Sequence, residues 1–289
     1  MYPLSCLDLQ HAAFDAIESQ ASVITIKNQH NDNAIHTHIQ DFDAITQGLQ
    51  RGTLMILGGS TGMGKSAFSL GLAHRISTQD SIPVLYGSFA SRPIDSYYKL
   101  LAFLSGIDLQ QLRAHRMWDH EWHLFGKTSR VLSDSPIFFF GKDCSSLKEI
   151  GCYCEAVKQQ TSIPPGVLFL DYLQLLTFLP SWQDRDIENL LRSLKIFAVQ
   201  HDLCIVLLCQ SAPNSELRNT RKPYLNDLPA VVAMQAFADI IALMHRDEFW
   251  HNELSTETRE PELIFYKNMD NPLGFISLRD DFFVKATRL

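Results

Sequence analysis

Positive charge is scarce in this 289-residue chain. Lys and Arg number 25 against 32 Asp and Glu, so the formal net charge is −7. This balance excludes a basic coat that binds nucleic acid along a whole surface, although local basic patches are still compatible with it. With 46% hydrophobic residues, the chain is also unlike the polar, highly charged sequences that stay disordered.

Long hydrophobic runs and metal-type cysteine pairs are missing as well. Apolar stretches such as 204–209 are far too short to span a bilayer, and the N-terminus lacks the pattern of a signal peptide. Cys152 and Cys154 stand one residue apart, a spacing that fits neither a zinc knuckle nor a redox pair. Cys204 and Cys209 are expected to be small buried hydrophobes. We therefore expect a cytoplasmic protein with reduced cysteines, no structural metal and no membrane contact.

Short apolar runs alternate along the chain with helical patterns. The apolar runs are 53–57, 83–87, 136–140, 167–171, 204–209 and 239–244. The helical patterns lie near 64–77, 94–105, 119–133, 145–160 and 184–200. This order predicts an α/β fold with a mostly parallel sheet flanked by helices on both faces.

The two ends of the chain differ from this pattern. Three apolar runs at 262–267, 274–278 and 281–285 follow one another without a helix, which predicts a C-terminal antiparallel hairpin. Residues 8–20 have helical spacing, and the polar stretch 27–37 resembles a loop or linker. The expected division is an N-terminal helix and linker over 1–37 and one larger domain over 38–289.

A phosphate-binding loop is the strongest motif. Residues 59–66 satisfy G-x-x-x-x-G-K-[ST] between an apolar strand and a helix, the context that this motif requires. Backbone amides of such a loop hold phosphate oxygens, the lysine neutralises the β- and γ-phosphates, and the hydroxyl binds Mg²⁺. The alternative is a simple glycine-rich turn. The predicted ligands of ATP are Gly59, Ser60, Thr61, Gly62, Met63, Gly64, Lys65 and Ser66.

Two polar residues follow neighbouring apolar strands. Asp171 ends VLFLD and is predicted to bind Mg²⁺ together with Ser66, unless it only caps a loop. Gln210 follows CIVLLC, at the strand end where ligands of open α/β sheets bind. It could sense the γ-phosphate or orient water, or it could be an ordinary loop amide.

At these residues the sequence resembles the RecA-like motor domain of DnaB-type replicative DNA helicases, over roughly residues 35–285. LFLDYLQLL is close to the family's IDYLQL strand, a more specific signal than a generic acidic strand end. The segments that carry the resemblance are GGSTGMGKSAF (58–68), LFLDYLQLL (168–176), LRSLKIFAVQHDLCIVLLCQ (191–210), ADIIALMHRDEFW (238–250) and YKNMDNPLG (266–274).

The resemblance implies a RecA-like P-loop NTPase that binds ATP and Mg²⁺ in a six-membered ring. In that family ATP lies between subunits, and loops in the channel track single-stranded DNA. Lys65, Gln210 and Lys267 are then the catalytic residues, with Lys267 reaching into the neighbouring subunit's site. We expect no counterpart of the family's primase-binding N-terminal domain in this sequence, and residues 8–20 are expected to be at most a linker helix that packs on a neighbour.

Three departures from the family pattern weaken the expected chemistry. The family's water-activating Glu is matched by Ala90, and the loss of a general base typically costs about 10²–10⁴-fold. The arginine-finger position is Met269, and losing a finger costs roughly 10³–10⁵-fold in comparable reactions. Arg279 is a candidate substitute for the finger, and Asp95 is the carboxylate nearest to Ala90 in sequence.

The third departure concerns DNA. The family's DNA-binding loop corresponds to 227–239, where Pro229, Ala230 and Val232 replace its Arg, Glu and Gly and no charge lies between the two flanking aspartates. Weak DNA binding is expected there, and an apolar exposed loop suggests a protein contact instead. The nearby cations Arg218, Arg221 and Lys222 resemble a solvated basic loop more than a DNA site.

Other clusters favour ordinary structural roles. His120 and His123 stand three apart rather than in the HExxH spacing, so a surface helix is preferred over a metal site. His36 and His38 have no cysteine near them in sequence, and Phe138–Phe140 resembles a buried core strand.

Two functions remain open from the sequence. The first is an ATP-driven DNA helicase or translocase in replication, supported by the phosphate loop, Asp171 and Gln210. The second is a nucleotide-gated module that hydrolyses ATP poorly and regulates a helicase or another replication partner. Ala90, Met269 and the uncharged stretch 228–238 support this second hypothesis.

Overall fold

The computed structural model describes residues 34–176, 178–179, 181, 183–211, 222–246 and 260–278. Residues from Ile35 onward belong to one compact unit. Within the described ranges, no helix combines the length and apolar character needed to cross a membrane.

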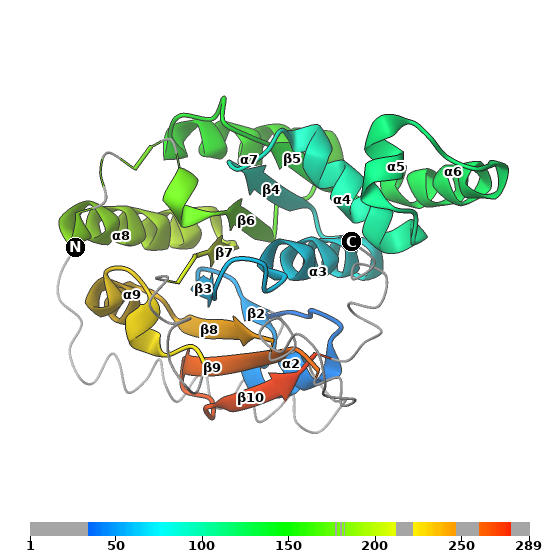
Figure 1. Ribbon diagram of the computed structural model, residues 1–289. Helices are drawn as coiled ribbons and strands as arrows, with labels where there is room; N and C mark the ends of the chain where they lie inside the picture. The colour runs from blue at the N-terminus through cyan, green and yellow to red at the C-terminus, as the bar shows by residue number, and fades with distance from the viewer. Residues whose placement is uncertain are drawn as a thin grey trace, which may run out of the picture. The chain divides into compact units, whose positions relative to one another are not determined.

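An eight-stranded sheet forms the centre of this unit, in the order β10-β9-β8-β3-β7-β6-β4-β5 (Figure 1). The six strands from β8 to β5 are parallel, whereas β9 pairs antiparallel with both β8 and β10. The predicted sheet and C-terminal hairpin are therefore confirmed. The strands are β3 (Leu54–Gly58), β4 (Val84–Ser88), β5 (Ile137–Phe140), β6 (Val167–Asp171), β7 (Cys204–Leu208), β8 (Ile240–His245), β9 (Glu262–Asn268) and β10 (Gly274–Ser277), and β1 (Ala34–Ile35) and β2 (Leu49–Gln50) pair separately.

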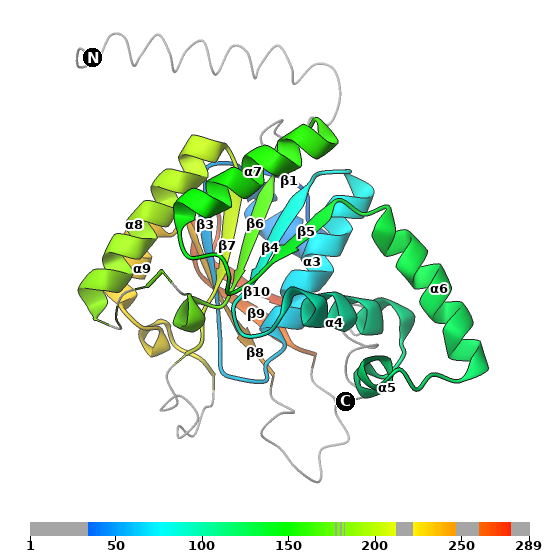
Figure 2. The same ribbon diagram turned by 90° about the horizontal axis from the view of Figure 1, so that it is seen from above.

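Helices cover both faces of the sheet, with α3 and α4 on one side and α7 and α8 on the other (Figure 2). The five predicted helical patterns correspond to α3, α4, α6, α7 and α8. The helices are α2 (Gln40–Thr46), α3 (Lys65–Gln79), α4 (Pro93–Ser105), α5 (Leu109–Ala114), α6 (Asp119–Ser133), α7 (Leu147–Thr161), α8 (Asp184–His201) and α9 (Val231–Phe237), with 3₁₀ turns η1 (Leu173–Leu175) and η3 (Leu225–Asp227).

Strand β3 shows why the apolar runs are continuous rather than alternating. Met55 and Leu57 pack in the core beneath α3, whereas Leu54 and Ile56 pack in the core beneath α8. Because successive side chains point to opposite faces, a strand covered on both sides needs apolar residues at every position.

The sheet edge departs from the expectation for Phe138–Phe140. Strand β5 is the last strand of the sheet, and Ile137, Phe138 and Phe139 are only half-buried while Phe140 is buried. The prediction of a fully buried core strand is wrong because an edge strand has a neighbour on one side only. The segments 8–20 and 281–285 lie outside the described residues.

An ion pair ties three elements together at the end of the sheet opposite the phosphate loop. Asp239, just before β8, accepts hydrogen bonds from the backbone N–H of Leu54 and from Lys195 Nζ of α8, each at 2.7 Å. Lys195 Nζ also donates to the carbonyl of Gly52 at 2.8 Å. This contact fixes the start of β8 against the start of β3.

Replacing Asp239 by Ala is expected to lower the free energy of unfolding by about 2 kcal/mol, because it leaves a partly buried ammonium and a strand N–H without their acceptor. Chemical denaturation followed by circular dichroism measures this loss. Glu188→Ala is the matched control, since the Glu188–Arg192 pair at 3.0 Å is more exposed and should contribute about 0.5 kcal/mol or less. Equal effects of the two substitutions would contradict this assignment.

Candidate functional site

The phosphate loop joins β3 to α3, and its backbone can be formed only with glycine at certain positions. Gly59, Gly62 and Gly64 have φ values of 144°, 81° and 94°, in the region that other residues rarely adopt. A Cβ atom at Gly59 would lie 2.7 Å from the carbonyl oxygen of Met244. The glycine spacing in the motif therefore has a steric cause in this fold.

Lys65 begins α3 and folds back over its own loop. Its Nζ donates to the carbonyl oxygens of Gly59 and Ser60, each at 2.7 Å. Burial lowers the pKa of Lys65 to about 8, while the neighbouring Cys209 and Asp171 act in the opposite direction. Lys65 thus places a titrating ammonium at the centre of the loop.

Asp171 ends β6 beside Ser88 of β4 and is only 4% exposed. Its carboxylate accepts a hydrogen bond from the Tyr86 hydroxyl at 3.1 Å. Burial raises the pKa of Asp171 above its ordinary value, although the nearby hydroxyls of Ser66 and Tyr86 oppose that shift. The structure therefore brings together the two residues that the sequence predicted as metal ligands.

A hydroxyl and a carboxylate are suitable oxygen ligands for Mg²⁺, which is commonly held by one or two protein groups plus phosphate oxygens. The charges of Lys99 and Lys65 also favour the ionised form of Asp171. Among the described residues, no group of three or more His, Cys, Asp or Glu side chains could hold a metal by itself. The Ser66–Asp171 pair thus fits a metal that arrives with a nucleotide.

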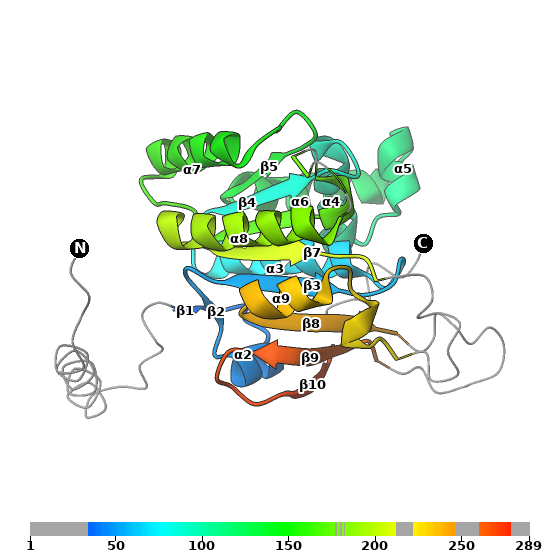
Figure 3. The same cartoon turned by 90° about the vertical axis from the view of Figure 1, so that its left-hand side faces the viewer.

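Gln210 follows β7 and extends toward the phosphate loop, where its Nε2 donates to Thr61 Oγ1. Ser60 and Ser211 also share a hydroxyl contact at 3.2 Å. Predicted residues from the loop, β6 and β7 therefore meet at one end of the parallel strands. Strand β7 pairs with β6 on one side and with β3 on the other, and Figure 3 shows β3 beside β7.

Three residues near this site were not singled out by the sequence. Tyr86 is fully buried and its hydroxyl contacts both Asp171 and, at 2.8 Å, Ser69 of α3. Gln174 of η1 hydrogen-bonds the backbone of Gln210. Gln174 lies inside the quoted YLQL segment, whereas neither Tyr86 nor Ser69 carries a sequence signal that distinguishes it from core residues.

The position expected to hold a general base has no carboxylate of its own. Ala90 is exposed just beyond β4, and no carboxylate from the following helix replaces it. Asp95 accepts from Arg92 at 3.2 Å and lies 3.8 Å from Arg113. The hydrogen bond from Arg92 holds the pKa of Asp95 below its ordinary value, which makes Asp95 a poor proton acceptor.

Lys267 and Met269 are not brought to the phosphate loop of their own chain. They lie at the end of β9, which is separated from β3 by β8. Lys267 Nζ donates to the carbonyl of Gln235 in α9 at 2.7 Å. Met269 is 41% exposed and has a left-handed φ of 48°. Arg279, the candidate substitute finger, lies outside the described residues.

The stretch expected to be an exposed DNA-type loop contains a packed helix, so that expectation is wrong. Met234 is buried and Phe237 packs on the same core, with the Arg192 guanidinium 5.4 Å from its ring centroid. Residues three apart share one face of a helix, and no glycine or proline interrupts 231–237. The opposite face of the helix is exposed: Val232 is 76% exposed, and Gln235 and Ala236 are exposed as well.

The cations near this helix lie partly outside the described ranges. Lys222 is described and pairs with Glu262 at 3.3 Å, whereas Arg218 and Arg221 fall in the undescribed segment 212–221. The described part therefore assigns Lys222 to a surface ion pair.

The histidines have local partners rather than a shared site. His38 Nε2 lies 2.8 Å from Asp80, and His36 Nδ1 lies 3.8 Å from Asp43. His120 and His123 belong to α6, as expected for a surface helix.

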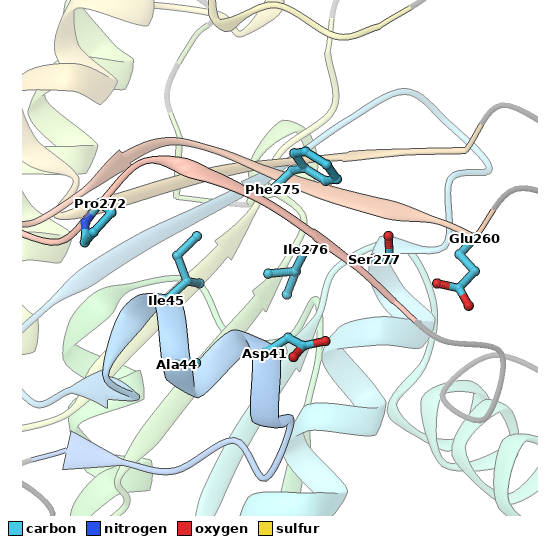
Figure 4. A pocket seen from close by; sticks show the side chains of 8 residues that line it. All are labelled: Asp41, Ala44, Ile45, Glu260, Pro272, Phe275, Ile276 and Ser277. Atoms are coloured by element: carbon cyan, nitrogen blue, oxygen red, sulfur yellow. The ribbon is translucent and has the colours of Figure 1, made fainter.

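A hollow of about 580 Å³ lies between α2 and β10, at the sheet edge remote from the phosphate loop (Figure 4). Ile45 and Ile276 face each other across it, and Phe275 of β10 also lines it. It includes no residue of the site described above, and we assign no role to it.

The burial of Lys65 predicts a pH-dependent affinity for ATP. A lysine with a pKa of about 8 loses its charge as the pH rises through 8, so phosphate binding must then take up a proton. Affinity should fall by about tenfold between pH 7 and pH 9. Titration calorimetry in buffers of different ionisation enthalpy measures both the ATP affinity and the proton uptake on binding. Lys65→Gln should remove the pH dependence of the affinity. A flat profile in the unaltered protein would contradict the assignment.

Comparison with known proteins gives a consistent result. A family model described as DnaB-like helicase C terminal domain matches residues 34–288. A probable replicative DNA helicase of Trieres chinensis is 29% identical over 83% of this chain, and the replicative DNA helicase DnaC of Bacillus subtilis (strain 168) is 26% identical over 91%. The chain spans 54% and 58% of these two relatives, little more than half of their length.

Two solved structures have the same fold. One, described as an ATPase domain, superposes with a TM-score of 0.81 at 24% identity, covering 97% of this chain and 98% of that one. A DnaB-like replicative helicase, described with its interactions with primase, gives a TM-score of 0.80 at 25% identity, covering 96% of this chain and 65% of that one. The phosphate loop, the strand order and the family match together show that this chain belongs to the DnaB-like helicase C-terminal domain family.

Proposed function

We propose that this chain is the ATP-driven motor of a replicative DNA helicase, in which ATP hydrolysis is coupled to translocation on single-stranded DNA. The observation that carries the proposal is the meeting of the Ser66 hydroxyl and the Asp171 carboxylate beside a glycine-built phosphate loop, where Ser66 acts to lower the pKa of Asp171. A hydroxyl at a helix start and an acid ending a neighbouring strand are the arrangement that ATP–Mg²⁺ requires.

The proposed roles follow from the positions of the side chains. Backbone amides of 59–66 bind phosphate oxygens at the start of α3, and the Lys65 ammonium turns from the carbonyls of Gly59 and Ser60 toward the β- and γ-phosphates. Ser66 and Asp171 hold Mg²⁺, which when bound neutralises phosphate charge. Gln210 contacts the γ-phosphate from the end of β7. Lys267 acts in the site of a neighbouring subunit.

The assembly and setting are proposed by analogy with the relatives. The chain would act as a cytoplasmic protein in a six-membered ring of its own copies, with single-stranded DNA and a replication protein as partners. Residues 1–37 would form an N-terminal helix and linker and residues 38–289 the motor, with Ala34–Ile35 already paired to β2.

Steady-state ATP turnover with and without single-stranded DNA tests the proposal. A several-fold stimulation by DNA supports a motor, and sedimentation with ATP present should show a ring. A strict monomer that turns over no ATP under any condition would contradict it.

The second candidate is a nucleotide-gated module that docks on a helicase or another partner and hydrolyses ATP poorly. Specific observations favour it. Ala90 stands where the family's water-activating Glu is expected, Asp95 forms ion pairs with Arg92 and Arg113, and α9 contains no charged side chain. ATP binding with no DNA-stimulated turnover in the unaltered protein would support the module over the motor, whereas slow turnover that DNA stimulates would support the motor.

A further inference from the structure

Gln174 bridges the ends of two neighbouring strands. It lies in η1, directly after β6, and its side chain crosses to the residue that follows β7. Its Oε1 accepts from the backbone N–H of Gln210 at 3.1 Å, and its Nε2 donates to the carbonyl of Gln210 at 2.8 Å. The same Nε2 lies 3.7 Å from Cys209 Sγ. One side-chain amide thus satisfies both polar groups of one backbone residue.

This contact continues the sheet beyond the point where the strands stop pairing. The last register pair of β6 and β7 is Leu170 with Leu207, so Gln210 lies past the end of the ladder. Gln174 supplies the donor and acceptor that a neighbouring strand would supply. The backbone of Gln210 is therefore fixed while its side chain points at Thr61 of the phosphate loop.

We propose that Gln174 is a positioning residue for recognition of the γ-phosphate: it holds Gln210 so that the site distinguishes ATP from ADP. The inference rests on the proposed nucleotide-binding function. Gln174 follows Asp171 by three residues, so the metal carboxylate and the support of Gln210 share one short segment. A change at Gln174 should act on ATP through Gln210 and leave ADP binding unaffected.

The side-chain chemistry predicts which substitutions fail. Gln174→Ala removes both hydrogen bonds. Gln174→Glu keeps the shape and one acceptor, but it removes the donor and sets a carboxylate oxygen against the Gln210 carbonyl. Both variants should release the Gln210 backbone, and the near-isosteric Glu variant covers the case in which the alanine variant folds poorly.

The test compares dissociation constants for Mg²⁺–ADP and for an ATP analogue with a non-hydrolysable β–γ bridge, also with Mg²⁺, by titration calorimetry. In Gln174→Ala and Gln174→Glu the preference for the ATP analogue should fall about tenfold, with ADP affinity unchanged. In a double-mutant cycle, Gln174→Ala should add nothing to Gln210→Ala, because both variants lose the proposed contact between the Gln210 side chain and the γ-phosphate.

Gln50→Ala is the matched control, because the Gln50 amide also donates to a backbone carbonyl, that of Gln47 at 3.1 Å, away from the site. Equal losses of ADP and ATP-analogue affinity in the Gln174 variants, or additive effects with Gln210→Ala, would overturn the inference. An unaltered protein with no preference for the ATP analogue would overturn it as well, while leaving nucleotide binding intact. Failure of the unaltered protein to bind either nucleotide would instead refute the proposed function.

Discussion

Replacing Ala90 by Glu is expected to raise ATP turnover by about 10²–10⁴-fold, the usual contribution of a positioned general base. Ala90 stands two residues beyond β4, whose last residue, Ser88, pairs with Asp171. A carboxylate at this exposed position would therefore lie beside the proposed metal and phosphate site. The fold should tolerate the longer side chain because Ala90 is exposed.

The control for this gain of activity is Ala90→Gln, which has nearly the same shape but cannot accept a proton. Adding Met269→Arg should raise turnover further only if the proposed ring assembles, because this position is separated from the phosphate loop of its own chain by β8 and would reach the site of a neighbouring subunit. Robust DNA-stimulated turnover by the unaltered protein would show that another group already activates water. An inert Ala90→Glu variant that still binds ATP would contradict the assignment of this position.

Replacing Lys65 by Ala is expected to weaken ATP binding about 100-fold, because charge-assisted hydrogen bonds to phosphate contribute about 1.5–3 kcal/mol each. In the structure the Lys65 ammonium donates to the carbonyls of Gly59 and Ser60, which belong to the same loop. Because these contacts join no second element to the loop, the helices and strands around the site should stay in place when Lys65 is replaced. Calorimetric titration with Mg²⁺–ATP measures the loss. Lys148→Ala, at an exposed position of α7, should leave the affinity unchanged. Similar affinities of Lys65→Ala and the unaltered protein would show that nucleotide binds elsewhere.

The sheet was predictable from the sequence because doubly covered strands need apolar residues on both faces. Runs such as 167–171 and 204–209 therefore mark β6 and β7 directly. Short helices were not predictable in the same way. The helix α9 was mistaken for a loop because its seven residues span barely two turns, and its position depends on packing against α8.

The site was predictable where a motif fixes the geometry and not where folding brings distant residues together. The glycine spacing of the loop identified Lys65 and Ser66, and the strand end identified Asp171. The supporting roles of Tyr86 and Gln174 depend on contacts across strands, 85 and 36 residues apart in the chain. Periodicity and local motifs carry no information about such contacts.

The most direct test of the account is a crystal structure of the protein with Mg²⁺ and a non-hydrolysable ATP analogue. The account predicts the triphosphate within residues 59–66, Lys65 Nζ turned from the carbonyls of Gly59 and Ser60 to the phosphates, and the metal beside Ser66 and Asp171. A loop that stays empty at saturating nucleotide, or a nucleotide bound elsewhere, would contradict it.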